Sequence, residues 1–173
     1  ILLIFLRRFL LSYFKDQVVA LGLVLGLLAT NAVQYIAVEG GQSHAWIFPL
    51  YVYLMVLSAS WHAHKTAGKS IAIGAIVGLG ILCRPTEGVM LFIPLLWGFQ
   101  RTTFVFFLKE NRYHFLLAGI AMSVVLLPQF VYWKYTTNHW IFDVGSKWDF
   151  LTPHFRVLVG PEKGWLMYTP ICW

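Results

Sequence analysis

The sequence contains little charge and almost no cysteine. Charged residues make up only 12% of its 173 residues, whereas 59% are hydrophobic and 17% are aromatic. A water-soluble domain of this length would lack sufficient polar surface, so the composition excludes an ordinary soluble domain and indicates a membrane domain. The two cysteines, Cys83 inside an apolar run and Cys172 near the end, support no disulfide framework and indicate no compartment.

Motifs of several common enzyme classes are also missing. The sequence has no Ser-His-Asp arrangement, no Walker-type glycine loop and no Cys-x-x-Cys pair, which removes the usual sequence evidence for a serine hydrolase, a P-loop site or a thiol redox centre. His62 and His64 flank a short basic loop, but two ligands without a nearby third carboxylate or thiolate make a poor metal site. No ligand set requires a metal, and a divalent cation stays open as a cofactor.

Three tracts between the apolar runs contain most of the positive charge. They hold eight of the thirteen basic residues but only two of the seven acidic ones, and therefore the whole formal net charge of +6. Because cytoplasmic loops are enriched in Lys and Arg, this distribution predicts a multispanning protein with these tracts on the inner face. It argues against a nucleic-acid partner, since the charge forms no single stripe. The tracts are residues 7–16, 62–70 and 101–114.

The apolar runs predict an all-α fold, a polytopic transmembrane bundle of about six to seven segments in a single domain over residues 1–173. Residues 71–83 span only about 20 Å as a helix, so they cross the membrane only if Arg84 lies below the far surface. An aromatic outer loop is expected over 134–164. Because the chain opens and stops within apolar runs, we expect it to be part of a longer protein. The predicted segments are 1–6 with an extension to 14, 17–38, 45–61, 71–83, 88–99, an interfacial 104–108, 115–133 and one starting at 165.

Glycines recur within two of these segments at spacings typical of closely packed membrane helices. The small-xxx-small pattern lets two helix backbones approach each other, and we interpret these glycines as scaffold rather than as phosphate loops. They are Gly22 and Gly26 in the second segment, and Gly74, Gly78 and Gly80 in the fourth.

Polar groups at membrane depth usually line a cavity or a substrate path, so we expect any chemistry on the outer side. There, Glu39 and two glycines lead through Ser43 and His44 into an apolar helix. Ser43 is a candidate cap for this helix, whose first turn, with His44, suits an anion. The alternative is a structural cap with an interfacial histidine.

A second outer feature is the turn Arg84-Pro85-Thr86-Glu87. Pro85 ends one helix and sets the start of the next, and Arg84 and Glu87 are candidates to pair across the turn. A phosphate-bearing lipid is a better partner for Arg84 than water. The alternative is an interfacial arginine that extends to the surface and a glutamate that caps the next helix.

The third outer feature is the aromatic loop 134–164. Its rings suit stacking on sugars or anchoring at headgroup depth, and anchoring is the expected role of most of them. Its charged side chains include Lys134, Asp143, Asp149 and Lys163.

Four short stretches occur in a recognisable order: Thr30-Asn31 through Tyr35, SHAWIF at 43–48, GLGILCRPT at 78–86 and GWLMYTP at 164–170. In order and spacing they resemble the middle of bacterial polytopic glycosyltransferases of the GT-C superfamily, relatives of the protein mannosyltransferases and aminoarabinose transferases. The resemblance runs through most of the chain. It implies an inverting transfer of a sugar from a polyprenyl-phosphate carrier to an acceptor on the outer face of the cytoplasmic membrane.

The resemblance also implies that the general base is an Asp in a first outer loop upstream of Ile1, so no catalytic residue is expected within this fragment. Where relatives often have an acidic residue near His44, this chain has Ser43-His44. Arg84, with Lys134 or Lys163, would supply the positive charge that a lipid-phosphate leaving group needs. The candidates for binding the acceptor or orienting the donor are Glu39, Ser43, His44, Glu87, Asp143 and Asp149.

Two other classes stay open at this point. A non-catalytic membrane subunit of a larger complex would show the same spans, charges and aromatic residues, with Arg84 and Glu87 forming a structural ion pair or a lipid contact. A transporter is supported by the short broken helices, but the sequence shows no internal repeat. An Asp or an Asp-Glu pair just after an upstream first transmembrane helix would favour the enzyme.

Overall fold

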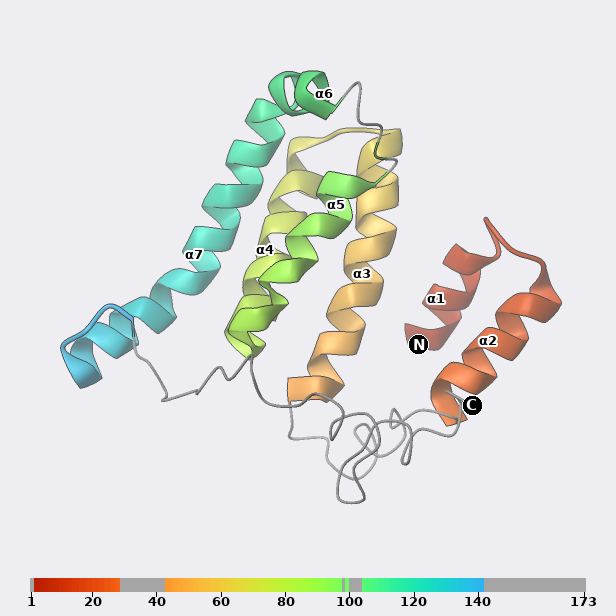
Figure 1. Ribbon diagram of the computed structural model, residues 1–173, viewed down its shortest axis with the longest axis horizontal. Coiled ribbons are helices and arrows are strands. Elements are labelled where there is room, and N and C mark those ends of the chain that lie inside the picture. Colours follow the sequence, from red (N-terminus) through yellow and green to blue (C-terminus); the bar gives the residue numbers. More distant parts are fainter. Residues whose placement is uncertain (1, 29–42, 98, 100–103, 142–173) are drawn as a thin grey trace, which may run out of the picture. The chain divides into compact units, whose positions relative to one another are not determined.

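The computed structural model describes residues 2–28, 43–97, 99 and 104–141, and in these ranges every regular element is helical (Figure 1). The predicted all-α class is therefore confirmed for the described residues. Contacts divide the chain into two units, unit 1 (Ile1–Ala45 with Asp143–Trp173) and unit 2 (Trp46–Phe142). Each unit is described by itself.

The described part of unit 1 consists mainly of two helices, α1 (Leu2–Leu10) and α2 (Asp16–Leu28). The guanidinium of Arg7 pairs with the carboxylate of Asp16 at the start of α2, where an acidic residue also complements the helix dipole. A Cβ added to Gly22 would meet no atom within 4 Å, and the same holds for Gly26. The close packing predicted for these two glycines is thus not seen among the described residues.

Unit 2 contains the helices that position the candidate site. Helix α4 begins after the cap Thr66, whose hydroxyl accepts from the Lys69 N–H at 3.4 Å. It ends at Arg84, which is held in an extended conformation by the following Pro85. The elements are α3 (Ser43–Ala63), α4 (Ala67–Cys83), the 3-10 helix η2 (Pro85–Leu91), α5 (Phe92–Leu96), α6 (Phe104–Glu110) and α7 (Arg112–Thr137).

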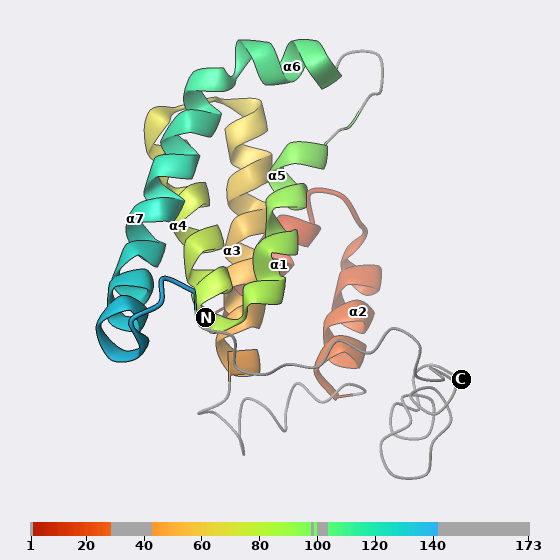
Figure 2. The same cartoon turned by 60° about the vertical axis from the view of Figure 1, so that its left-hand side comes forward.

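The helices of unit 2 alternate in direction between two ends (Figures 1 and 2). α3 and α4 form an antiparallel pair, η2 and α5 return beside them, and α6 lies across the end from which α7 starts. The predicted basic tract 62–70 and the described part of the tract 101–114 therefore share one end, here called the basic end. The turn at Arg84 lies at the opposite end, here called the Arg84 end.

Five buried apolar side chains from three helices form the core of unit 2. Leu54 and Trp61 come from α3, Ile73 and Val77 from α4, and Met90 from η2, and each is at most 5% exposed. Contacts among these side chains join α3, α4 and η2 in one core. The Arg84 turn, which lies between α4 and η2, is thereby attached to this core.

α4 and α7 run parallel and touch through glycines of α4. A Cβ added to Gly74 would collide with the backbone carbonyl of Ala118, and one added to Gly78 would lie 3.0 Å from Val125 Cβ. Gly80 in turn makes room for the sulfur of Met90. The close packing predicted for these three glycines is confirmed.

Two described helices are long and apolar enough to cross a membrane: α3 over Trp46–Ala63, with a mean hydropathy of 1.2, and α7 (Arg112–Thr137), whose most apolar 18 residues have a mean hydropathy of 2.0. α7 has no buried residue, although it is apolar on all sides. A helix that is apolar all round belongs in a protein core or in lipid, so this exposure favours membrane association. One outward row of α7, each member more than half exposed, is Leu116, Ile120, Val124, Leu127 and Val131.

Several boundaries differ from the sequence-based prediction. α4 starts at Ala67 rather than at residue 71, because Thr66 provides a cap, and its 17 residues reach about 26 Å. α7 continues to Thr137, so the predicted loop from 134 begins too early; Asn138 ends the helix in the left-handed conformation (φ 61°). The part of that loop from residue 142 onward and the segment predicted from 165 lie outside the described residues.

Candidate functional site

Arg84 occupies the junction between α4 and η2. Its backbone N–H donates to the Gly80 carbonyl at 2.9 Å, and its carbonyl accepts from the Glu87 N–H at 2.9 Å. Its side chain is exposed and forms no ion pair or hydrogen bond with any residue that the structure describes. The backbone is therefore fixed while the guanidinium is available to an anion.

Glu87 accepts a hydrogen bond from a residue of α3. The hydroxyl of Tyr51 donates to Glu87 Oε2 at 2.7 Å, across a part-buried contact between α3 and η2. Glu87 thus bonds to Tyr51, and the Arg84–Glu87 pair considered from the sequence is not formed. Sequence reasoning missed Tyr51, because a tyrosine within an apolar helix is ordinary until its partner is known.

The Tyr51–Glu87 contact predicts a measurable loss of stability in Tyr51→Phe. This change leaves the Glu87 carboxylate without its donor and is expected to lower the free energy of unfolding by about 1 kcal/mol, measured by equilibrium unfolding in detergent. Tyr135→Phe is the matched control, because Tyr135 is 90% exposed. Equal stability of the two variants would show that the contact contributes nothing.

Lys134 lies near the end of α7 and is occupied locally. Its ammonium donates to the Asn138 carbonyl at 2.9 Å and to Asn138 Oδ1 at 3.0 Å, and it lies 5.8 Å from the centre of the Trp140 ring. A lysine in the last turn complements the helix dipole. Lys134 therefore caps α7 in this structure, and a role toward a phosphate requires it to leave these partners.

The other predicted site residues are not placed by the structure. His44 lies in the first turn of α3, as predicted, whereas Ser43, predicted as the cap before the helix, is its first residue; the side chains of both are not among those described. The four remaining candidates, Glu39, Asp143, Asp149 and Lys163, lie outside the described residues. Arg84 and Glu87 are thus the two predicted site residues that the structure places in the same turn, although they form no ion pair with each other.

No family model, curated protein or solved structure matches this chain. The candidate site is therefore interpreted from its own geometry.

A second polar group, here called the Trp61 cluster (Trp61, Ser70 and His114), lies at the basic end and was not predicted. Trp61 Nε1 donates to Ser70 Oγ at 2.9 Å, and Ser70 Oγ lies 2.8 Å from His114 Nδ1. The three residues come from α3, α4 and α7, and Trp61 and Ser70 are each 2% exposed. The cluster links three helices through polar contacts, and Ser70 Oγ also donates to the Thr66 carbonyl at 3.2 Å.

Aromatic and basic residues surround the Trp61 cluster. Phe107 packs against the Trp61 ring at 6.2 Å and stacks on His62 at 5.4 Å. The ammonium of Lys65 lies 5.9 Å from the centre of the Trp61 ring and 5.7 Å from that of Phe107, within cation–π range. A positive charge is therefore held directly beside the cluster.

The histidines of this region are used in packing. His62 Nε2 donates to the Pro94 carbonyl at 2.9 Å, which ties α3 to α5. Among the described residues, no group of three or more His, Cys, Asp or Glu side chains is arranged to hold a metal ion. His62 therefore acts as a helix-to-helix contact in this part of the chain.

Proposed function

We propose that this chain is part of a polytopic membrane glycosyltransferase, which moves a sugar from a polyprenyl-phosphate carrier to an acceptor on the outer face of the bacterial cytoplasmic membrane. In this proposal Arg84 binds the phosphate of the donor. The observation that carries it is the exposed guanidinium of Arg84 on a fixed turn, next to a Glu87 that bonds to Tyr51 instead. Arg84 thereby keeps its charge for an external anion.

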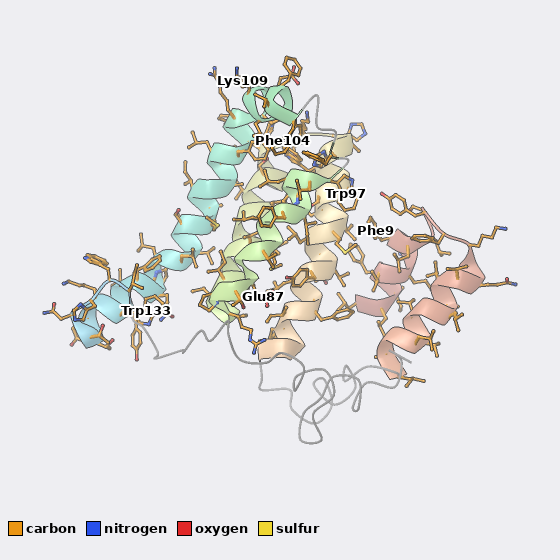
Figure 3. The ribbon with its side chains drawn as sticks, viewed as in Figure 1. Phe9, Glu87, Trp97, Phe104, Lys109 and Trp133 are labelled. Atoms are coloured by element: carbon orange, nitrogen blue, oxygen red, sulfur yellow. The ribbon has the colours of Figure 1, made fainter. Side chains whose placement is uncertain are left out.

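The orientation follows from the two ends of unit 2. Figure 3 labels Glu87 near the Arg84 end and Lys109 on α6 at the basic end. Lys65, Lys69 and Arg112 also belong to the basic end, where α3 meets α4 and α6 meets α7. Because basic loops stay in the cytoplasm, this arrangement supports an outward-facing Arg84. The other transmembrane segments predicted from the sequence, and with them a multi-pass topology, are part of the same proposal.

The chemistry requires a fixed positive charge. When the glycosidic bond to the carrier breaks, negative charge develops on the lipid phosphate, and a planar guanidinium binds two of its oxygens at once. Lys163, and Lys134 after release from Asn138, would add charge at the same phosphate. Polar residues of the outer side orient the donor or the acceptor. They are Glu39, Ser43, His44, Glu87, Asp143 and Asp149.

Native mass spectrometry of the full-length protein in mild detergent, with a polyprenyl phosphate, tests the role of Arg84. We expect Arg84→Ala to lower lipid retention roughly tenfold or more, because a charge-assisted hydrogen bond contributes about 1.5–3 kcal/mol. Arg8→Ala is the control, since Arg8 is an exposed arginine of α1. Both variants should unfold like the wild type.

Equal and weak retention by wild type and Arg84→Ala would contradict the proposal. Arg84 would then be a structural or general lipid contact, and a non-catalytic membrane subunit would become the better interpretation of the same helices and charges.

A further inference from the structure

A cavity of about 350 Å³ lies within unit 2, between α4, α7 and the η2–α5 segment. Its walls are almost entirely apolar and include Ile73, Leu95, Phe115 and Met122. This volume is within the range of small-ligand pockets, about 300–1,000 Å³. Leu91, one of its lining residues, is 37% exposed, so the wall reaches the surface of unit 2 there.

The polar part of this cavity is the Trp61 cluster, whose three residues all line it. The Trp61 N–H and the Ser70 hydroxyl bond within the cluster, so neither requires a polar group from a ligand. His114 uses Nδ1 toward Ser70, and its Nε2 has no hydrogen-bond partner among the described residues. The cavity therefore favours an apolar chain and offers one polar contact at one end.

Positive charge is concentrated at that same end. Lys65 lies beside the Trp61 ring, and Lys109 in the last turn of α6 and Arg112 at the start of α7 belong to the same end of unit 2. Lys69, which donates to two carbonyls at the end of α3, adds a further cation. Basic pockets between membrane helices on the cytoplasmic side suit anionic headgroups. The charges thus complement an anionic headgroup, and the apolar walls complement an acyl chain of the same lipid molecule.

We propose that this cavity binds an anionic glycerophospholipid, with one acyl chain between α4, α7 and α5 and the headgroup phosphate near Lys65 and His114. The site lies at the basic end, away from the Arg84 turn, and depends on membrane embedding but not on sugar transfer. It would join α4, α7 and the η2–α5 segment through a shared lipid chain. Its occupant is a bulk membrane lipid rather than the polyprenyl donor.

Gly119 provides a direct test, because it lines the cavity and a Cβ added there would meet no atom within 4 Å. Gly119→Leu is expected to fill part of the cavity with its side chain and to favour the helix. Gly22→Leu is the matched control, a helical glycine with equally open surroundings in unit 1. Lys65→Gln removes the charge beside Trp61, and Lys15→Gln is its control in another basic tract.

The measurement is native mass spectrometry of the full-length protein with phosphatidylglycerol or phosphatidylcholine of identical acyl chains. We expect the wild type and both controls to retain phosphatidylglycerol. Gly119→Leu should retain about tenfold less phosphatidylglycerol than the wild type. Lys65→Gln should no longer retain phosphatidylglycerol in preference to phosphatidylcholine. Circular dichroism of each variant in the same detergent verifies that it is folded.

Retention of phosphatidylglycerol by Gly119→Leu at the level of Gly22→Leu would overturn the proposal, as would a wild type that does not distinguish the two lipids. If Gly119→Leu fails to fold, the Lys65→Gln comparison decides the question by itself. Polyprenyl-phosphate retention by these variants should stay at the wild-type level, so the result is independent of Arg84.

Discussion

Gly74→Ala is expected to lower the free energy of unfolding by about 3 kcal/mol, at the upper end of the usual cost of overpacking. The added Cβ would collide with the carbonyl of Ala118, which is backbone and cannot move aside as a side chain does. Without this contact the change would be favourable, because alanine is the better helix former by about 1 kcal/mol. The loss therefore measures how closely α4 and α7 are packed.

Gly68→Ala is the control for this experiment, since Gly68 is also in α4 and a Cβ there would meet no atom within 4 Å. Reversible unfolding in mixed micelles of mild detergent and dodecyl sulfate, followed by circular dichroism, gives both values. Gly68→Ala should be neutral or slightly stabilising. A Gly74→Ala variant as stable as Gly68→Ala would contradict the close contact with Ala118.

Trp61→Ala is expected to lower the free energy of unfolding by about 3–5 kcal/mol, the range for removing a large buried aromatic ring. Trp61 is 2% exposed, packs against Phe107 and Phe115 and supplies the N–H that binds Ser70. Its removal leaves a void next to the cavity and takes one hydrogen-bond partner from Ser70 Oγ, which keeps His114 and the Thr66 carbonyl. The same micelle titration measures the effect.

Two further variants separate the causes of this loss. Trp46→Ala removes a tryptophan from the same helix, but this one is 64% exposed, so the expected change is below about 1 kcal/mol. Trp61→Phe keeps a ring and removes the N–H, which should cost about 1 kcal/mol beyond any repacking. If Trp61→Ala and Trp46→Ala were equally stable, Trp61 would not belong to the core of unit 2.

The helical elements were largely predictable from the sequence, because apolar runs and helix-breaking residues are local features. Pro85 ends α4 where predicted, and Gly74 and Gly78 form the expected contact surface. The boundaries that were missed depend on single hydrogen bonds, such as the Thr66 cap that moves the start of α4 back to Ala67. A hydropathy pattern does not show such bonds, because a polar capping residue looks the same in it as any other polar residue between two apolar runs.

The candidate site was predictable only in part. The sequence placed Arg84 on a turn and named Glu87 as a candidate to pair with it or to cap the next helix. It did not indicate Tyr51, the donor that Glu87 has in the structure, because Tyr51 is 36 residues away on another helix. The contact between Ser70 and His114 spans 44 residues and was missed for the same reason. Pairings at such distances depend on which helices become neighbours, and no local pattern of a single sequence encodes this.

The parallel contact of α4 and α7 has a consequence for the order of assembly. Parallel neighbours cannot form a simple hairpin, so the chain must return through η2 and α5 before α7 can reach Gly74. Ala118 leaves the ribosome roughly 40 residues after Gly74, which corresponds to a delay on the order of seconds at about 5–20 residues per second. During this interval the glycine surface of α4 has no α7 to cover it, and the surrounding lipid or the insertion machinery must shield it until translation brings its partner.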